Sequence, residues 1–274
     1  MTPVTENPAD EQRARRRRNL RRLVNARSIA FVGGSLAAGG ISYCRAMGFQ
    51  GDVWAVNPTR SELEGVPCVA SVSELPGVPD ATWIAVSAQR AIDTVVELNE
   101  IGAPSAVCYT AGFGESGDHE LERQLISAAG DMAIVGPNCI GAVNYLDAIP
   151  IAIAPALGVD RPAHGVAVIA QSGTIIGNIV SSQRSVPVSH LLSMGNQSIL
   201  DIADGIDAVT DDPRVDAILL YIEGIRDAGA FARAACRAFE NGKVIIALKG
   251  GISETGRALA LSHTGSMAGS ATIY

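Results

Sequence analysis

The chain has 274 residues, of which 47% are hydrophobic and 18% are charged, and its formal net charge is −7. This acidic balance argues against a nucleic-acid-binding protein, which carries a basic excess on one face, and favours small molecules or other proteins as partners. A chain of this length can bury one large core or two ordinary ones, so two domains are the default expectation.

Residues 1–22 form a basic and polar N-terminal arm. A twin-arginine signal needs an apolar segment and a cleavage site, but residues 28–34 are better explained as a strand that enters a turn. We therefore favour a solvated helix or a disordered arm over a targeting signal or a segment that binds an anionic surface. The arginines concerned are Arg13, Arg15, Arg16, Arg17, Arg18, Arg21 and Arg22.

Short β-branched runs alternate with longer amphipathic stretches over residues 23–147. This alternation is typical of βαβ units in an α/β fold with a parallel sheet, and it predicts a first, doubly wound domain. Strands are predicted at 28–32, 53–56, 81–86, 105–109 and 132–135, and helices near 40–47, 89–101 and 118–129.

A link rich in Ala, Pro and Ile, residues 148–163, leads into a second βα series over residues 164–274. The sequence stops at Tyr274, inside the last predicted helix, and no strand follows to close the second sheet. We expect either an unusually short fold or a domain that is truncated at its C-terminus. Strands are predicted at 165–169, 188–192, 217–221 and 244–248, and helices beginning near Thr174, Ser198, Ala228 and Arg257.

The first predicted strand ends in a glycine-rich turn that contains Gly33 and Gly39. Free N–H groups at a helix N-terminus favour an anion, and glycines allow a pyrophosphate to come close. However, GxGxxG is absent, and Asn57 follows the second strand where a dinucleotide site has an acidic residue. Arg60 would suit a cofactor phosphorylated on its ribose, such as CoA. A tight turn without a ligand is the alternative interpretation.

A second turn of this type, residues 171–174, precedes the helix that begins near Thr174. Considered alone, Ser172 could simply cap that helix. A third similar element at residues 262–266 favours a different interpretation, in which two helix N-termini face each other and hold a small dianion.

His263 lies in this third element among small hydroxyl and glycine residues, which leave its ring approachable. Imidazole can act as a nucleophile and carry a phosphoryl group, although a lone histidine is more often structural. Glu223 follows the strand at 217–221, where a carboxylate could accept a ring N–H and fix the tautomer. A solvated glutamate, or one paired with Arg226, is the alternative.

The five cysteines are odd in number and lack CxxC spacing, so neither a disulfide framework nor a zinc site is predicted. No apolar run reaches the roughly 18 residues of a transmembrane helix. We therefore expect a soluble protein of the reducing cytoplasm, without a metal site. The cysteines are Cys44, Cys68, Cys108, Cys139 and Cys236.

Six short motifs occur in order along the chain: RSIAFVGGS at 27–35, GPNCIG at 136–141, QSGT at 171–174, SMGNQ at 193–197, YIEG at 221–224 and SHTGS at 262–266. Together they resemble the α-type half of NDP-forming acyl-CoA synthetases, of the ADP-forming acetate–CoA ligase type, which are relatives of the succinyl-CoA synthetase α subunit. The resemblance covers about residues 20–274. It implies a Rossmann-like CoA-binding domain followed by a flavodoxin-like domain of the succinyl-CoA synthetase type.

The resemblance also implies roles for individual residues. His263 would be phosphorylated transiently, and Glu223 would orient its ring. The transferred phosphate would be held by Ser172, Gly173 and Thr174. CoA would be bound by a set in the first domain, which consists of Gly33, Ser35, Gly39, Asn57, Pro58, Arg60, Ser87, Thr110, Gly112 and Asn138.

The reaction implied is that of an acid:CoA ligase, which interconverts acyl-CoA, NDP and phosphate with a carboxylate, CoA and NTP through an acyl phosphate. ATP/ADP or GTP/GDP, with Mg, would be handled by an ATP-grasp β-type subunit or domain, which the sequence lacks. The chain would therefore be one part of an oligomer or of a longer protein. The acyl group, whether acetate-like, aryl or dicarboxylic, is not predicted.

Two other interpretations remain open at this point. One is a non-catalytic CoA or acyl-CoA-binding module of a larger protein, such as the regulatory domain of a lysine acetyltransferase. The other is a nicotinamide-dependent oxidoreductase, which rests on the first glycine turn and is disfavoured by Asn57.

Overall fold

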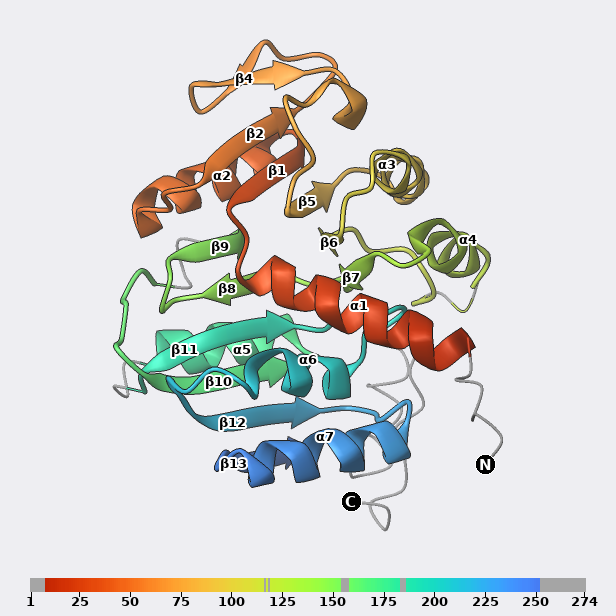
Figure 1. The fold of residues 1–274 in the computed structure, drawn as a ribbon. Coiled ribbons are helices and arrows are strands. Elements are labelled where there is room, and N and C mark those ends of the chain that lie inside the picture. Colours follow the sequence, from red (N-terminus) through yellow and green to blue (C-terminus); the bar gives the residue numbers. More distant parts are fainter. Residues whose placement is uncertain (1–7, 116, 118, 154–157, 183–185, 252–274) are drawn as a thin grey trace, which may run out of the picture.

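The computed structural model describes residues 8–115, 117, 119–153, 158–182 and 186–251. Within them, two α/β units follow each other along the chain, and each is built on one central sheet (Figure 1). The predicted α/β fold with two sheets in tandem is confirmed. The boundaries 23–147 and 164–274 remain predictions.

The first sheet has seven strands in the order β3-β4-β2-β1-β5-β6-β7. β1 pairs in parallel with β2 on one side and with β5 on the other, so the strand order reverses beside β1, as in a doubly wound fold. Its elements are β1 (Ser28–Gly33), α2 (Ser35–Met47), β2 (Asp52–Val56), β3 (Glu62–Leu63), β4 (Val66–Val69), the 3₁₀ turn η1 (Val72–Glu74), β5 (Ala81–Ala85), α3 (Ala88–Glu100), β6 (Ser105–Cys108), α4 (Glu120–Ala129) and β7 (Ala133–Val135).

Helices cover both faces of this sheet, which explains why β1 is buried along its whole length. α3 shows how the sequence achieves this. Its apolar residues Ala91, Ile92, Val95 and Leu98 recur at helical spacing and are all buried, so one stripe of the helix faces the sheet. The pattern that predicted the helix is therefore the pattern that packs it.

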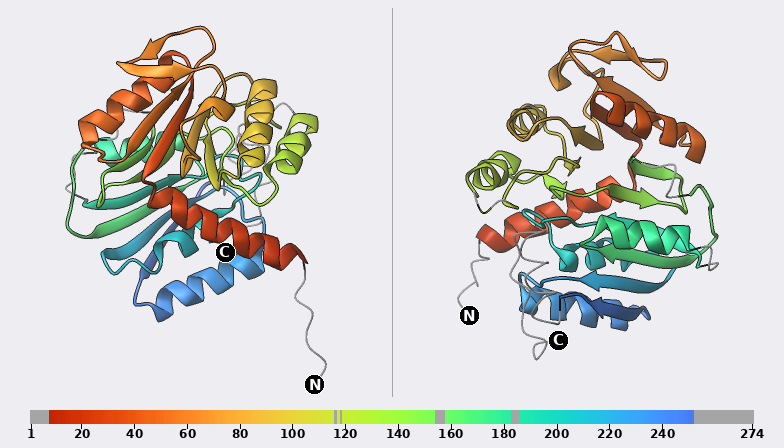
Figure 2. Two further views of the ribbon diagram at one scale, coloured as in Figure 1. Left: turned by 45° about the horizontal axis from the view of Figure 1, so that its top comes forward. Right: turned by 180° about the vertical axis from the view of Figure 1, so that it is seen from behind.

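The second sheet has six strands in the order β13-β12-β10-β11-β8-β9. β10 lies between β11 and β12 and is parallel to both, so this sheet also reverses its strand order, beside β10. α5 lies on one face and α6 and α7 lie on the other (Figures 1 and 2). The elements are β8 (Gly141–Asn144), β9 (Ile149–Ala152), β10 (Gly165–Ala170), α5 (Gly173–Ser181), β11 (Val188–Ser193), α6 (Ile202–Val209), β12 (Val215–Ile222), α7 (Ala228–Glu240) and β13 (Val244–Lys249).

A hairpin of β8 and β9 precedes the predicted second domain in sequence but belongs to its sheet. β8 pairs antiparallel with β11, and β9 pairs antiparallel with β8. We expected residues 148–163 to be a link without strands. Pro150 lies within β9, which is an edge strand, one of the few places where a sheet accepts proline.

The helix α1 (Pro8–Val24) lies across both units (Figure 1). Its C-terminal turns contribute Leu20, Leu23 and Val24 to the core, and it contacts β6 and β7 of the first unit and α6 of the second. Asn19 donates to the carbonyl of Asp131, and Arg16 donates to the carbonyl of Gly130, both at the end of α4. The helix thus connects the two units directly.

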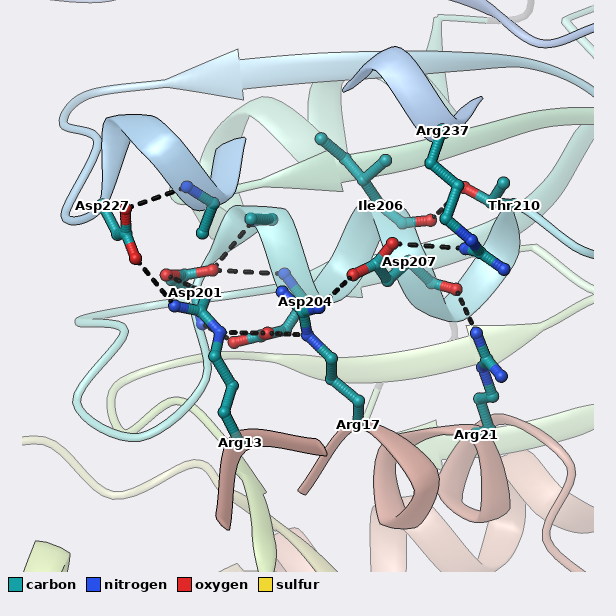
Figure 3. Close-up of polar contacts among 12 residues, drawn as sticks. Arg13, Arg17, Arg21, Asp201, Asp204, Ile206, Asp207, Thr210, Asp227 and Arg237 are labelled. Atoms are coloured by element: carbon teal, nitrogen blue, oxygen red, sulfur yellow. Dashed lines mark hydrogen bonds and ion pairs between the residues drawn. The ribbon is translucent and has the colours of Figure 1, made fainter. Parts of the chain in front are cut away.

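The arginines of α1 pair with aspartates of α6 (Figure 3). Arg13 donates to Asp201 at 2.7 Å and to Asp204 at 3.1 Å. Arg17 donates to Asp204 at 2.8 Å and pairs with Asp207 at 2.9 Å. Residues 8–24 form a helix, which is one of the two forms expected for the arm. The expectation that this helix is solvated is wrong, because several of its arginines have acidic partners that lie about 190 positions away in sequence.

No helix among the described residues is both long and apolar enough to cross a membrane. The five cysteines all lie in the described part of the chain and are all free.

Candidate active site

A cavity of about 450 Å³ lies where the strand order of the first sheet reverses. Open α/β sheets bind ligands at this place, beyond the carboxyl ends of the strands. The ends of β1, β2 and β5 form its floor, and the first turn and body of α3 form one wall. Its lining includes Gly33, Gly34, Asn57, Pro58, Thr59, Ser71, Val86, Arg90, Asp93, Thr94 and Glu97.

Asn57 holds the turns at the edge of this cavity together. Its Nδ2 donates to the Gly33 carbonyl at 2.8 Å, and its Oδ1 accepts the N–H groups of Thr59 and Arg60 at 2.9 and 3.0 Å. The amide therefore ties the end of β2 to the glycine turn after β1. An acidic residue could accept the same N–H groups but could not donate to the Gly33 carbonyl. The structure therefore needs an asparagine at this position, in addition to its predicted role in binding CoA.

Of the ten residues predicted to bind CoA, three line this cavity: Gly33, Asn57 and Pro58. Two others lie at helix starts, since Ser35 is the first residue of α2 and Ser87 precedes α3. The remaining five lie elsewhere: Gly39 within α2, Arg60 on the exposed turn after β2, Thr110 and Gly112 after β6, and Asn138 in the second cavity.

A second cavity, of about 460 Å³, lies between the two units. One wall comes from the loop after β6 and from residues 138–140, and the other comes from the loops after β10 and β11. It brings together Asn138 and the predicted phosphate turn. The residues that line it are Tyr109, Ala111, Asn138, Cys139, Ile140, Gln171, Ser172, Gly173, Thr174, Gly195 and Asn196.

The phosphate turn begins the helix α5 at the edge of this cavity. Ser172 is the residue before the helix, with extended backbone angles of −106° and 120°, and its side chain makes no capping bond to the described helix. The first N–H groups of α5 have no partner within the helix and carry the positive end of its dipole. The turn can therefore offer backbone donors to an anion in the cavity.

Glu223 lies at the carboxyl end of β12, where the second sheet reverses its strand order. It is 7% exposed. Its N–H and that of Gly224 donate to the Gln171 Oε1, and the Gln171 Nε2 donates to the Gly224 carbonyl at 2.6 Å. Gln171 lines the cavity whereas Glu223 does not, so Glu223 is joined to the cavity wall through the backbone bonds to Gln171. His263 lies outside the described residues.

Glu115 and Asn196 lie in this region but were not among the predicted site residues. The Glu115 Oε2 accepts the N–H groups of Gly112, Phe113 and Gly114 at 2.8 to 3.1 Å, and its Oε1 accepts the Asn196 Nδ2 at 2.8 Å. Burial raises the pKa of the Glu115 carboxyl, but the bonds from Asn196 and from the backbone outweigh it and leave this pKa below its ordinary value. Glu115 is therefore an ionised link between the units.

Among the described residues, no group of three or more His, Cys, Asp or Glu side chains could hold a metal ion.

Two family models match consecutive parts of the chain. A CoA-binding domain matches residues 27–145, and a succinyl-CoA ligase-like flavodoxin domain matches residues 163–274. The chain belongs to the NDP-forming acyl-CoA synthetase family. The resemblance inferred from the six motifs is thus confirmed, as is the order of a CoA-binding domain and a flavodoxin-like domain.

Individual members of the NDP-forming acyl-CoA synthetase family agree with this assignment. The chain is 39% identical to the α subunit of acetate–CoA ligase (ADP-forming) II of Pyrococcus furiosus, over 82% of this chain and 49% of the relative. It is 34% identical to a trans-feruloyl-CoA synthase from an unknown prokaryotic organism, over 90% of this chain and 37% of the relative. The chain spans less than half the length of these two relatives.

A solved structure of the same family has the same fold. The dinucleotide-forming acetyl-coenzyme A synthetase 1 of Ca. Korarchaeum cryptofilum, solved in complex with phosphate and ADP, superposes with a TM-score of 0.85 at 33% identity, over 93% of this chain and 56% of that one.

Proposed function

We propose that this chain is the α-type part of an acid:CoA ligase (NDP-forming), which binds CoA and passes a phosphoryl group through His263. One observation carries the proposal. The cavity between the units brings Asn138, from the GPNCIG motif of the first unit, together with Ser172, Gly173 and Thr174 of the second. Motifs far apart in sequence thus line a single site, as a reaction between CoA and phosphate requires.

The first cavity supports the CoA part of the proposal. Its floor includes the glycine turn after β1, Arg90 supplies a cation, and the Asp93 and Glu97 carboxylates can accept hydrogen bonds from hydroxyl groups such as those of a ribose. One end of an elongated cofactor would lie here, and its thiol end would extend along the carboxyl edge of the first sheet toward the second cavity. The predicted residues Ser35, Ser87, Thr110 and Gly112 follow strands β1, β5 and β6 along this edge.

The proposed chemistry has three steps. A phosphate oxygen bonds to the acyl carbon, the carbon–sulfur bond breaks, and CoA leaves as a thiolate that takes up a proton. A ring nitrogen of His263 then bonds to phosphorus, and the carboxylate leaves. Finally a β-phosphate oxygen of NDP takes the phosphoryl group from the ring. Backbone donors at the start of α5 would stabilise the charge on the phosphoryl oxygens, and Glu223 would orient the His263 ring.

The nucleotide step needs a component that this sequence does not contain. We propose an ATP-grasp subunit or domain that binds ATP/ADP or GTP/GDP with Mg, and an oligomeric or longer parent protein. The α-subunit names of relatives such as the Pyrococcus furiosus ligase support this proposal. The acetate and feruloyl names of relatives support a small carboxylic acid as the substrate. A cytoplasmic location remains part of the proposal.

Phosphate labelling tests the proposal directly. The chain would be incubated with its ATP-grasp partner and γ-³²P-ATP, and the label measured before and after treatment with acid, which cleaves phosphohistidine. We expect acid-labile label on the wild type and on a His119→Ala control, and none on His263→Ala. Equal labelling of His263→Ala would exclude the phosphohistidine. The melting temperature would be measured with CoA and with NADH. A rise with CoA without any labelling would favour a non-catalytic CoA-binding module, whereas a rise with NADH alone would favour an oxidoreductase.

A further inference from the structure

The walls of the second cavity meet at a contact between two loops, 136–138 of the first unit and 193–198 of the second. The Asn196 N–H donates to the Pro137 carbonyl at 3.0 Å, and the Ser198 N–H donates to the Gly136 carbonyl at 3.2 Å. The contact leaves no room for a side chain at Gly195, because a Cβ there would lie 2.7 Å from the Asn138 carbonyl oxygen. The backbones of the two units therefore touch directly beside the cavity.

Side chains extend this contact along the cavity wall. The Asn138 Nδ2 donates to the Asn196 Oδ1 at 3.3 Å, and the Asn196 Nδ2 donates to the Glu115 Oε1 at 2.8 Å. Asn196 is only 7% exposed. Its side-chain amide thus accepts a bond from one segment of the first unit and donates a bond to another. A rotation of this amide by 180° would break both bonds.

Glu115 completes the arrangement by shaping its own loop. Its second carboxylate oxygen accepts three consecutive N–H groups, those of Gly112, Phe113 and Gly114. This loop also carries Tyr109 and Ala111, which line the cavity. One carboxylate therefore fixes the first-unit wall internally and attaches it to Asn196 of the second unit. A displacement of Asn196 would be transmitted to both walls.

We propose that Glu115 and Asn196 are positioning residues for the acyl-transfer step, because they hold the CoA-binding and phosphate-binding walls of the second cavity at a fixed separation. The proposal rests on the proposed function. Acyl transfer needs a thioester presented by the first unit and a phosphate held by the second, so it depends on this separation. Binding of CoA at the first cavity, and transfer between the nucleotide and His263, do not require both walls.

An exchange of the two functional groups tests the pair with little change of shape. Asn196→Asp places a carboxylate opposite Glu115 and removes the bond between them. In the double variant Glu115→Gln/Asn196→Asp, the glutamine oxygen can accept the three N–H groups, and its amide can donate to the new aspartate. The aspartate can still accept the Asn138 Nδ2. The network is restored with one bond reversed in direction.

Acyl transfer would be measured with acetyl-CoA and inorganic phosphate on the complete enzyme, as release of CoA thiol. We expect Asn196→Asp to slow this step by about a hundred-fold, since misplacement by about 1 Å can have that effect. The double variant should recover most of the rate. His263 labelling should stay within about two-fold of wild type, and Glu120→Gln, on the surface of α4, serves as a matched control. A double variant as slow as Asn196→Asp would overturn the proposal.

Hydrogen exchange separates this proposal from the proposed function. The amides of residues 112–114 should exchange at least about ten-fold faster in Asn196→Asp than in wild type, because their acceptor loses its anchor, and should be protected again in the double variant. If the wild type releases no thiol, the ligase function fails while this pattern still tests the pair. If Asn196→Asp leaves the exchange of these amides unchanged, Asn196 does not hold the loop and the positioning role fails.

Discussion

Arg13 and Asp204 are 191 positions apart in sequence, and the Arg13 Nε donates to the Asp204 Oδ1 at 3.1 Å. Arg17 donates to the same oxygen. Asp204 is 3% exposed, so its charge depends on these guanidinium groups for compensation. A buried carboxylate that loses such a partner has no water to replace it, which makes the pair costly to break.

Removing Arg13 should therefore destabilise the fold strongly. In Arg13→Met, Asp201 loses its guanidinium partner, and among the described arginines only Arg17 still pairs with Asp204. We expect the free energy of unfolding to fall by about 3 kcal/mol, within the range found for broken buried pairs. Urea denaturation followed by circular dichroism would measure it. The matched control is Arg22→Met, whose arginine is 56% exposed and pairs with Asp80; its effect should stay below about 1 kcal/mol. Equal losses in both variants would contradict the role of burial.

Acid should destabilise the chain through His190. Burial lowers the pKa of His190 to about 4 from its ordinary value of 6.5, although the nearby Asp212 acts in the opposite direction. Between these two values the unfolded chain binds a proton that the folded chain does not, so stability falls as the pH is lowered from about 6.5 to 4. The loss attributable to this group is on the order of 3 kcal/mol. His190→Leu should flatten the pH dependence of urea unfolding in this range.

The pKa of His164 is shifted in the opposite direction to that of His190, so His164 serves as a control. A hydrogen bond and the charge of Asp216 raise the pKa of this exposed histidine. Its contribution is present below pH 6.5 and is lost as the pH rises through its raised pKa. His164→Leu should therefore leave the acid limb of the stability curve unchanged. A flattened acid limb in His164→Leu, or an unaltered one in His190→Leu, would refute the assignment.

Glycine substitutions should distinguish the loop contact from an ordinary helix position. Gly195 has φ of +54°, and backbone atoms of Pro137 and Asn138 occupy the place where a Cβ would lie, so Gly195→Ala should reduce the free energy of unfolding by about 2 kcal/mol or more. Gly39 lies inside α2 with open space where a Cβ would be, and Gly39→Ala should stabilise the chain by about 0.5 to 1 kcal/mol. Thermal unfolding of both variants would show opposite shifts.

The same Gly39 variant tests the predicted CoA set. Gly39 does not line the first cavity whereas Asn57 does. Gly39→Ala should therefore keep the CoA affinity of wild type, and Asn57→Ala should lower it by about ten-fold or more, because the glycine turn loses the bond to the Gly33 carbonyl. Isothermal titration with CoA would measure both. A CoA affinity of Gly39→Ala clearly below that of wild type would show that Gly39 belongs to the binding site.

Hydrophobic periodicity was sufficient to predict most of the helices and strands, because each depends on a local pattern. α3 was expected at 89–101 and spans Ala88–Glu100, and β10 was expected at 165–169 and spans Gly165–Ala170. β9 was missed since a proline interrupts its short run and its pairing depends on β8. α1 was assigned to the wrong environment because charged residues carry no local sign of a distant partner.

The site residues also divide into those that a local motif predicts and those that only the tertiary structure reveals. Ser172, Gly173, Thr174 and Asn138 were predicted from motifs and do converge on one cavity. Asn196 lies in a motif that was recognised, but nothing in SMGNQ indicates that its amide bonds to Glu115. Glu115 itself follows an ordinary glycine-containing loop. Only the packing of one unit on the other brings Glu115 against Asn196, which lines the cavity.

The β8–β9 hairpin also bears on how the protein can be divided. A fragment that starts at residue 164 would lack the strand that pairs with β11. The N–H and C=O groups along that edge of β11 would then be open to pairing with another copy, and such an edge promotes aggregation. A fragment that contains only the flavodoxin-like unit should therefore begin before Gly141, so that it includes both strands of the hairpin.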